Sequence, residues 1–191
     1  MPRRDRTRRA RIQPYQRVRT VKFLTHLRRL APATLAAVAF AAAAANEPDL
    51  NWVNASRGVI PKGSLAVGQD VNGKALYACR ARLANGADVP GKIREPLIGC
   101  TVLHGGLEWS LASYQVLRDD PKAIRWVSGN SVPPRAYPVG READGTAVFL
   151  CRAKRPDGSV QIGRVGATGT CLYGFGGKEE QVAEFEVLVR P

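Results

Sequence analysis

The chain has 191 residues and a formal net charge of +13 at pH 7, but most of this charge lies at one end. Residues 1–45 contain eleven Lys and Arg against one acid, a net charge of +10, whereas residues 46–191 contain 18 basic and 15 acidic residues, a net of +3. Because the larger part is nearly neutral and shows no basic stripe or recognition helix, the composition argues against nucleic-acid binding.

Residues 1–45 have the parts of a secretory signal. Basic residues precede the apolar stretch Leu30–Ala45, which ends in three alanines before Asn46. This A-x-A pattern predicts cleavage near Ala45 and a periplasmic or secreted protein. The stretch of 16 residues is shorter than the about 20 that a membrane-spanning helix needs, so we expect no membrane span after the leader is removed. The alternative is a disordered basic tail.

The rest of the chain contains the same pattern twice. From Pro61 to Lys92 each marker recurs 72 residues later, and from Cys100 onward the offset is 71. The clearest pair of segments is Y-A-C-R-A at 77–81 and F-L-C-R-A at 149–153. A period of this size predicts one supersecondary unit that occurs twice, with its polar positions in equivalent places.

Turn signals divide each copy into short strands. Asn72-Gly73 in the first copy corresponds to Asp144-Gly145 in the second, and such dipeptides favour the tight turns of β-hairpins. Turn signals every 8–13 residues, without an amphipathic helical window, predict an all-β domain. The expected strands are Leu65–Gly68, Ala75–Arg82, Asp88–Ile93, Gly99–Leu103 and Ser113–Leu117, then Ala147–Lys154, Val160–Val165, Thr170–Tyr173 and Glu184–Val189.

Neither copy alone has strands apolar enough for an independent core. We therefore expect residues 46–121 and 122–191 to interlock as one sandwich-like or barrel-like domain with pseudo-twofold symmetry. The aromatic residues that match between the copies, such as Trp52 and Trp126, are interpreted as core residues. Trp109 has no counterpart in the second copy.

Four cysteines follow the leader, two in each copy at matching places. An even number in an exported chain favours disulfides, and the repeat symmetry favours Cys79–Cys100 and Cys151–Cys171. A loop of about 20 residues closed in this way gains roughly 3 kcal/mol in the chain-entropy model. The alternatives are bridges between the two copies, or four buried free thiols.

Three polar positions recur at turns or strand ends. An acid and a cation at adjoining strand ends can bind a neutral polyol, accepting from one hydroxyl and donating to another, or can form a salt bridge that holds a loop. The equivalent residues in the first and second copies are Asp70 and Glu142, Lys92 and Arg164, and Glu108 and Glu179. An acid in a turn, such as Asp70, can also bond its own backbone. For Glu108 and Glu179 a structural salt bridge is the favoured interpretation.

Signals for catalysis or a cofactor are weak. Residues 46–191 contain one histidine, His104, and no C-x-x-C pair, so we expect no metal site, no cofactor and no enzymatic activity. The one catalytic alternative is a carboxylate pair formed by Asp70 and Glu142 across the pseudo-twofold, similar to a glycosidase dyad.

The segment from Trp52 to Leu117 resembles a DM-nine repeat, and Trp126 to Leu188 resembles a second, more diverged copy. The elements G-x-D-x-x-G, Y-x-x-R-A, P-G-K and G-G-x-E occur in this order in the first copy. The resemblance covers nearly all of the chain after the leader. It implies tandem all-β units that interlock in pairs, often in homodimers, with no known catalytic activity. Characterised members include mannose-binding lectins, and the module also accompanies pore-forming natterin-like proteins.

The resemblance also implies a sugar site at the Asp of G-x-D and the Lys of P-G-K, here Asp70 and Lys92. The second copy departs from the motif, with Glu142 and Arg164 in their places. These four residues are the expected ligand-binding residues, and the first copy is the stronger candidate. We expect a carbohydrate-binding module for glycans, mannose-type sugars among them. The alternative is a non-catalytic structural or protein-interaction module of the envelope.

Overall fold

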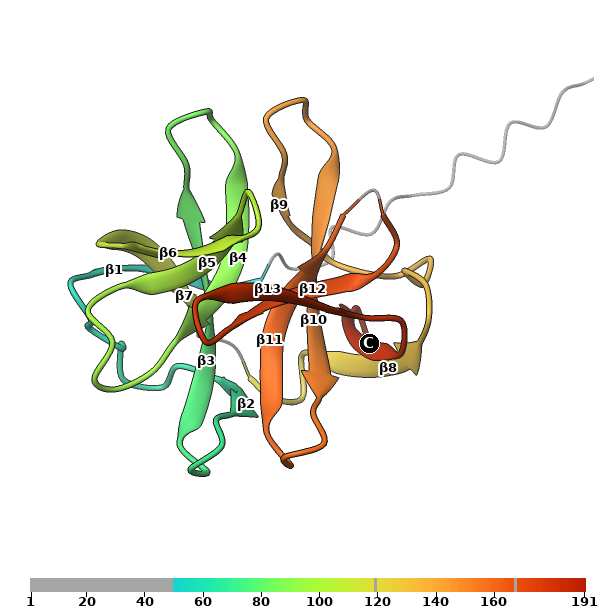
Figure 1. Ribbon diagram of the computed structural model, residues 1–191, viewed down its shortest axis with the longest axis horizontal. Helices are drawn as coiled ribbons and strands as arrows, with labels where there is room; N and C mark the ends of the chain where they lie inside the picture. The colour runs from blue at the N-terminus through green and yellow to red at the C-terminus, as the bar shows by residue number, and fades with distance from the viewer. Residues whose placement is uncertain (1–49, 119, 167) are drawn as a thin grey trace, which may run out of the picture. The chain divides into compact units, whose positions relative to one another are not determined.

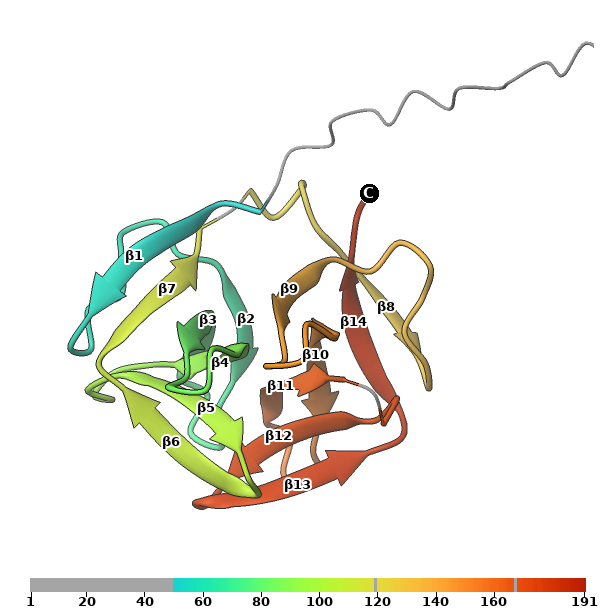
Figure 2. The same cartoon turned by 90° about the horizontal axis from the view of Figure 1, so that it is seen from above.

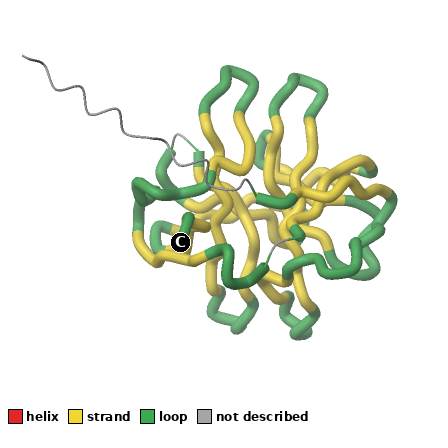
Figure 3. Tube along the Cα trace, turned by 180° about the vertical axis from the view of Figure 1, so that it is seen from behind, coloured by secondary structure: helices red, strands yellow, loops and turns green. Residues whose placement is uncertain are grey.

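The computed structural model describes residues 50–118, 120–166 and 168–191 (Figure 1). The predicted leader, 1–45, with its cleavage near Ala45, lies outside them. The described residues form fourteen β-strands joined by turns and loops, with no helix among them (Figure 3). No described segment is therefore a helix long and apolar enough to cross a membrane.

The strands of the two copies follow one another in equivalent order. Those of the first copy are β1 (Trp52–Ser56), β2 (Ala66–Gln69), β3 (Ala75–Arg82), β4 (Asp88–Ile93), β5 (Cys100–His104), β6 (Leu107–Leu111) and β7 (Ser113–Leu117). Those of the second are β8 (Arg125–Gly129), β9 (Pro138–Arg141), β10 (Ala147–Lys154), β11 (Val160–Val165), β12 (Cys171–Phe175), β13 (Lys178–Val182) and β14 (Phe185–Val189).

The sequence prediction found nine of these strands, with five reproduced to the residue. The five that it missed are β1, β6, β8, β9 and β13. These strands are only four or five residues long, and most of their positions are exposed or half-buried. Four of them carry little apolar alternation, which is the signal that identifies a strand in a sequence, and β6 alternates over only five residues.

All fourteen strands belong to one antiparallel sheet that closes on itself. Its order is β1-β7-β3-β2-β11-β12-β13-β6-β5-β4-β9-β10-β14-β8, with further pairing of β3 with β4 and of β10 with β11. Strands β2, β3 and β4 of the first copy and β9, β10 and β11 of the second therefore form a ring (Figure 2). The predicted all-β, interlocked architecture is confirmed.

The two copies join at equivalent points of this ring. Gln69 of β2 pairs with Val160 of β11, and Arg141 of β9 pairs with Asp88 of β4. Each of these pairs becomes the other when the repeat offset of 72 residues is applied. This exchange is the pseudo-twofold symmetry that the sequence predicted.

The glycine that opens each G-x-acid motif lies at these junctions. A Cβ atom on Gly140 would lie 2.1 Å from the carbonyl oxygen of Asp88, and one on Gly68 would lie 2.4 Å from that of Val160. Both distances are far below van der Waals contact, and both obstructing atoms belong to the backbone. The motif glycines are thus required by the close approach of the two copies.

Replacing Gly140 with alanine is expected to lower the free energy of unfolding by about 1–3 kcal/mol, because the added methyl group must push two backbones apart. Gly129→Ala is the matched control, since a Cβ there meets nothing within 4 Å and no left-handed φ is involved. Urea unfolding followed by circular dichroism measures both variants. Equal stability of the two variants would contradict the steric explanation.

Three clusters of buried side chains form the core. The first is shared by both copies and contains Val67, Leu76, Ala78, Leu117, Tyr137, Val139, Leu150, Ile162 and Leu188. Each copy also has a cluster of its own, built around its cysteines. Because the first cluster takes residues from both copies, neither copy buries its apolar face alone.

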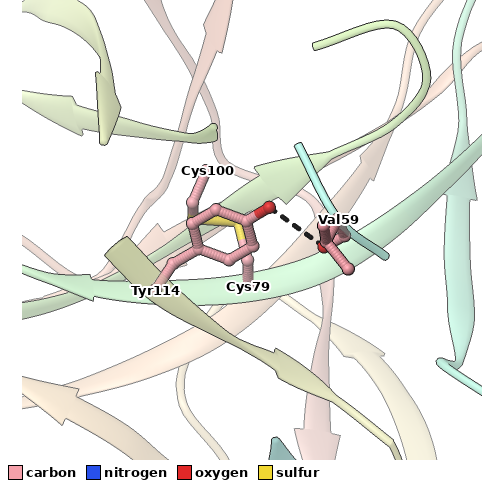
Figure 4. The surroundings of a disulfide bond; sticks show 4 residues. All are labelled: Val59, Cys79, Cys100 and Tyr114. Carbon is pink, nitrogen blue, oxygen red and sulfur yellow. Dashed lines mark hydrogen bonds between the residues drawn. A yellow bond between two sulfur atoms is a disulfide. The ribbon is translucent and has the colours of Figure 1, made fainter. Parts of the chain in front are cut away.

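Both disulfides form within a copy, as the repeat symmetry predicted. Cys79 bonds to Cys100 and Cys151 to Cys171, and all four cysteines are fully buried. Tyr114 lies beside the first disulfide, and its hydroxyl donates a 2.9 Å hydrogen bond to the carbonyl oxygen of Val59 (Figure 4). Each bridge joins the long central strand of its copy, β3 or β10, to the next hairpin.

Trp52 and Trp126 pack against the shared core, as predicted, and each is covered by an arginine. The guanidinium of Arg80 lies 4.6 Å from the ring centroid of Trp52, and that of Arg152 lies 4.4 Å from that of Trp126. These are the arginines of the repeated R-A elements, and cation–π contact explains their recurrence. The covered faces are not offered to a sugar.

Candidate functional site

Asp70 organises the turn between β2 and β3. Its Oδ1 accepts 2.9 Å hydrogen bonds from the backbone N–H groups of Asn72 and Lys74. The residue is only 8 % exposed. The turn interpretation of Asp70 is therefore correct, but it accounts for just one of the two carboxylate oxygens.

The second carboxylate oxygen of Asp70 lies beside Arg94, a cation that was not among the predicted site residues. Oδ2 lies 3.1 Å from Nε of Arg94, yet this buried oxygen accepts no hydrogen bond from any residue that the structure describes. The two charges are close, but the N–H direction does not suit a hydrogen bond. The second copy has Gly166 at the position of Arg94. Arg94 was therefore not predicted, because the prediction relied on polar residues that recur in both copies.

Lys92 does not contact Asp70 but reaches into the other copy. Its Nζ lies 3.1 Å from Oε1 of Glu108 and donates a 3.0 Å hydrogen bond to Oε1 of Gln161. It also donates to the carbonyl oxygen of Gly174. Gln161 and Gly174 lie on β11 and β12, so Lys92 joins the two copies.

Burial lowers the pKa of Lys92 below its usual range, and the cations Arg94 and Arg155 act in the same direction. The carboxylate of Glu108 opposes this effect. The Lys92 side chain is 11 % exposed and that of Glu108 is 16 % exposed. At this depth an ammonium needs its partners, because an unpaired buried charge is strongly destabilising.

The equivalent residues of the second copy pair with each other. Nη1 of Arg164 donates to Oε1 of Glu142, and no cation occupies the position of Arg94. Glutamate is one methylene longer than the Asp70 side chain, which extends its reach toward Arg164. Of the two predicted acid–cation pairs, only Glu142 and Arg164 form a salt bridge with each other, because Asp70 and Lys92 have other partners.

Glu108 and Glu179 also differ, although they occupy equivalent positions. Besides its contact with Lys92, Glu108 accepts a 2.8 Å hydrogen bond from the N–H of Gly177 through Oε2. The side chain of Glu179 is exposed, and only its backbone N–H bonds across the copies, to Gly106. The predicted structural pairing is confirmed for Glu108, whereas no described side chain pairs with Glu179.

Residues 50–118, 120–166 and 168–191 contain no group of three or more His, Cys, Asp or Glu side chains that could hold a metal ion. What the arrangement does provide is a buried carboxylate oxygen beside a guanidinium at one turn. Such a pair can accept a hydrogen bond from one hydroxyl group and donate to another.

The chain is similar to one known protein family and to a solved structure. The family model described as "DM9 repeat" matches residues 38–111 and 83–182. A search of curated proteins found no match. The crystal structure of the nematode sperm cell motility protein MFP2B matches with a TM-score of 0.53 and 15 % sequence identity. The match covers 74 % of this chain and 44 % of that one, so the chain spans less than half of MFP2B. At this identity the likeness concerns the fold.

Proposed function

This chain belongs to the DM9 repeat family, and from that premise we propose that it is a non-catalytic, carbohydrate-binding module whose sugar site lies in its first repeat. The observation that carries the proposal is the buried Oδ2 of Asp70, which lies beside Arg94 and accepts no hydrogen bond from the described part of the chain. A sugar hydroxyl that donates to this oxygen would satisfy it, while Arg94 donates to a neighbouring hydroxyl. Mannose-type sugars are the first candidates.

In this proposal the second repeat lacks a working copy of the site. Its acid and cation, Glu142 and Arg164, bond to each other, and the buried atom there that has no hydrogen-bond partner among the described residues is a donor, Nε of Arg164, not a carboxylate oxygen. Lys92 supports the site indirectly, because its ammonium is engaged between the repeats. The proposal thus keeps Asp70 from the expected set as a direct ligand and adds Arg94.

Affinity at one such site is expected to be low. A single monosaccharide held by a few hydrogen bonds binds near millimolar, about −4 kcal/mol. Pairing of sites in a homodimer would raise the apparent affinity without new contacts. Two disulfides suit an oxidising compartment, which supports a secreted or periplasmic location.

Asp70→Asn is expected to weaken glycan binding at least tenfold while the protein stays folded. The amide keeps an oxygen for the N–H groups of Asn72 and Lys74, but its nitrogen cannot accept a hydroxyl proton. Glu142→Gln is the matched control in the second repeat and is expected to keep full binding. Binding of the purified protein to a glycan array and to mannan beads measures both variants, with circular dichroism as the folding check.

Two results would count against the proposal. Undiminished binding by the Asp70→Asn variant would place the sugar elsewhere. Failure of the wild-type protein to bind any glycan would favour the second candidate function, a structural or protein-interaction module of the envelope. The way in which Lys92 and Glu108 brace the two repeats supports that candidate.

A further inference from the structure

A cavity of about 480 Å³ opens in the first repeat next to the Asp70 turn. Two of its lining residues connect it to the proposed sugar site. The N–H of Lys74 donates to Asp70, and Glu95 directly follows Arg94. The volume falls within the range of about 300–1,000 Å³ that is typical of small-ligand pockets. The lining residues are Ile60, Pro61, Lys62, Gly63, Ser64, Lys74, Ala75, Tyr77 and Glu95.

The charged groups of this cavity are exposed and have no ion-pair partner among the described residues. Lys62, Lys74 and Glu95 are exposed, and no described carboxylate or cation lies within salt-bridge distance of their side chains. The half-buried ring of Tyr77 and the side chain of Ile60 add apolar surface. The lining therefore combines two ammonium groups, one carboxylate and a phenol around an apolar patch.

The second repeat shows that the fold does not need most of these polar groups. At the equivalent positions it has Pro134 for Lys62, Ala136 for Ser64, Thr146 for Lys74 and Phe149 for Tyr77. Strands β9 and β10 nevertheless form with the same lengths as β2 and β3 and with the same register shift. Folding therefore does not explain why the first repeat carries them.

We propose that this cavity binds an acidic saccharide unit, with its carboxylate at Lys62 and Lys74 and its hydroxyls at Glu95 and Tyr77. The inference rests on the proposed function and specifies its ligand class. Two cations against one carboxylate leave a net positive charge that favours an anionic sugar over a neutral one. The apolar surface of Ile60 and Tyr77 receives the C–H face of the ring. Asp70 and Arg94 hold the neighbouring sugar unit.

Three variants test the cavity, and two of them take their new residue from the second repeat. Lys74→Thr removes one ammonium but keeps the backbone contacts with Asp70, Glu95→Ala removes the carboxylate, and Tyr77→Phe removes only a hydroxyl. Thr and Phe already occur at the equivalent places in the second repeat, and Glu95 is exposed, so the three variants are expected to fold. Calorimetric titration of the protein compares glucuronate- and galacturonate-terminated disaccharides with their glucose- and galactose-terminated counterparts.

The wild-type protein is expected to bind the acidic disaccharides about tenfold or more tightly, since hydrogen bonds to charged groups are the stronger ones. Lys74→Thr should abolish this preference, and added salt should reduce it. Glu95→Ala and Tyr77→Phe should weaken both sugar classes.

Three results would overturn the inference. Equal affinity for acidic and neutral sugars, unchanged in the Lys74→Thr variant, would exclude the acidic subsite. This result would still be compatible with the proposed sugar site at Asp70. Displacement of the acidic disaccharides by millimolar inorganic phosphate would indicate a simple anion site. No binding of any sugar would refute the proposed function together with the inference.

Discussion

Replacing Cys79 and Cys100 together with alanine is expected to lower the free energy of unfolding by about 2–5 kcal/mol. The disulfide closes a loop with a sequence separation of 21 residues, so its loss restores conformational freedom to the unfolded chain. Both cysteines are fully buried beside Tyr114. The loss of packing in the folded state therefore adds to the entropic effect.

The second bridge, Cys151–Cys171, is expected to contribute a similar amount, because its loop and burial are nearly the same. Removing both pairs should then take away a large part of the roughly 5–15 kcal/mol that stabilises a typical domain. Urea unfolding at pH 7 measures the single-pair and double-pair variants. A loss of less than 1 kcal/mol for either pair would show that the packed repeats hold without covalent closure.

Glu108→Ala is expected to destabilise the protein at pH 7 by about 3–5 kcal/mol, because it leaves the buried Lys92 ammonium without a counter-charge. The remaining partners of Lys92, Gln161 and the carbonyl of Gly174, are neutral. The N–H of Gly177 also loses its acceptor. Glu179→Ala is the matched control, since that glutamate is exposed, and it should change stability by less than about 0.5 kcal/mol.

The effect of Glu108→Ala should depend on pH. Burial holds the pKa of Lys92 below its ordinary value of 10.5, and removal of Glu108 takes away the main influence that raises it. Between the folded-state pKa and 10.5 the unfolded chain binds more protons than the folded one, so stability rises with pH in this window. The destabilisation is therefore expected to shrink between pH 7 and pH 10. When Lys92 is replaced with Met, the destabilisation caused by Glu108→Ala should no longer vary with pH. A destabilisation that is independent of pH both with and without Lys92 would exclude Lys92 as the cause.

The repeat made much of the fold predictable. Strands β3, β4, β7, β10 and β11 agree with their predicted bounds, and both disulfides are the pairs that the repeat symmetry favoured over bridges between the copies. These features depend on local alternation, on turn dipeptides and on matched spacing, which a single sequence displays directly. Strand β13 lacks that alternation, whereas β6 alternates apolar and polar residues but is short and mostly exposed, and hydrogen bonds to neighbouring strands define both.

The candidate site was less predictable, because its partners come from tertiary packing. Asp70 and Lys92 were identified by their recurrence, but a sequence gives no sign that Lys92 crosses to the second copy. Arg94 was missed because it has no counterpart in the second copy.

The sequence by itself determined an all-β chain of two equivalent units, two disulfides and a short set of recurring charges. Only the tertiary structure decided which charges meet, since equivalent residues of the two copies receive different partners. Glu142 reaches the cation of its own P-G-K-like element, whereas Asp70 faces Arg94 and leaves Lys92 to bridge the repeats. Side-chain length and a single arginine-to-glycine difference determine this choice, because a salt bridge forms only where two side chains end within about 4 Å of each other.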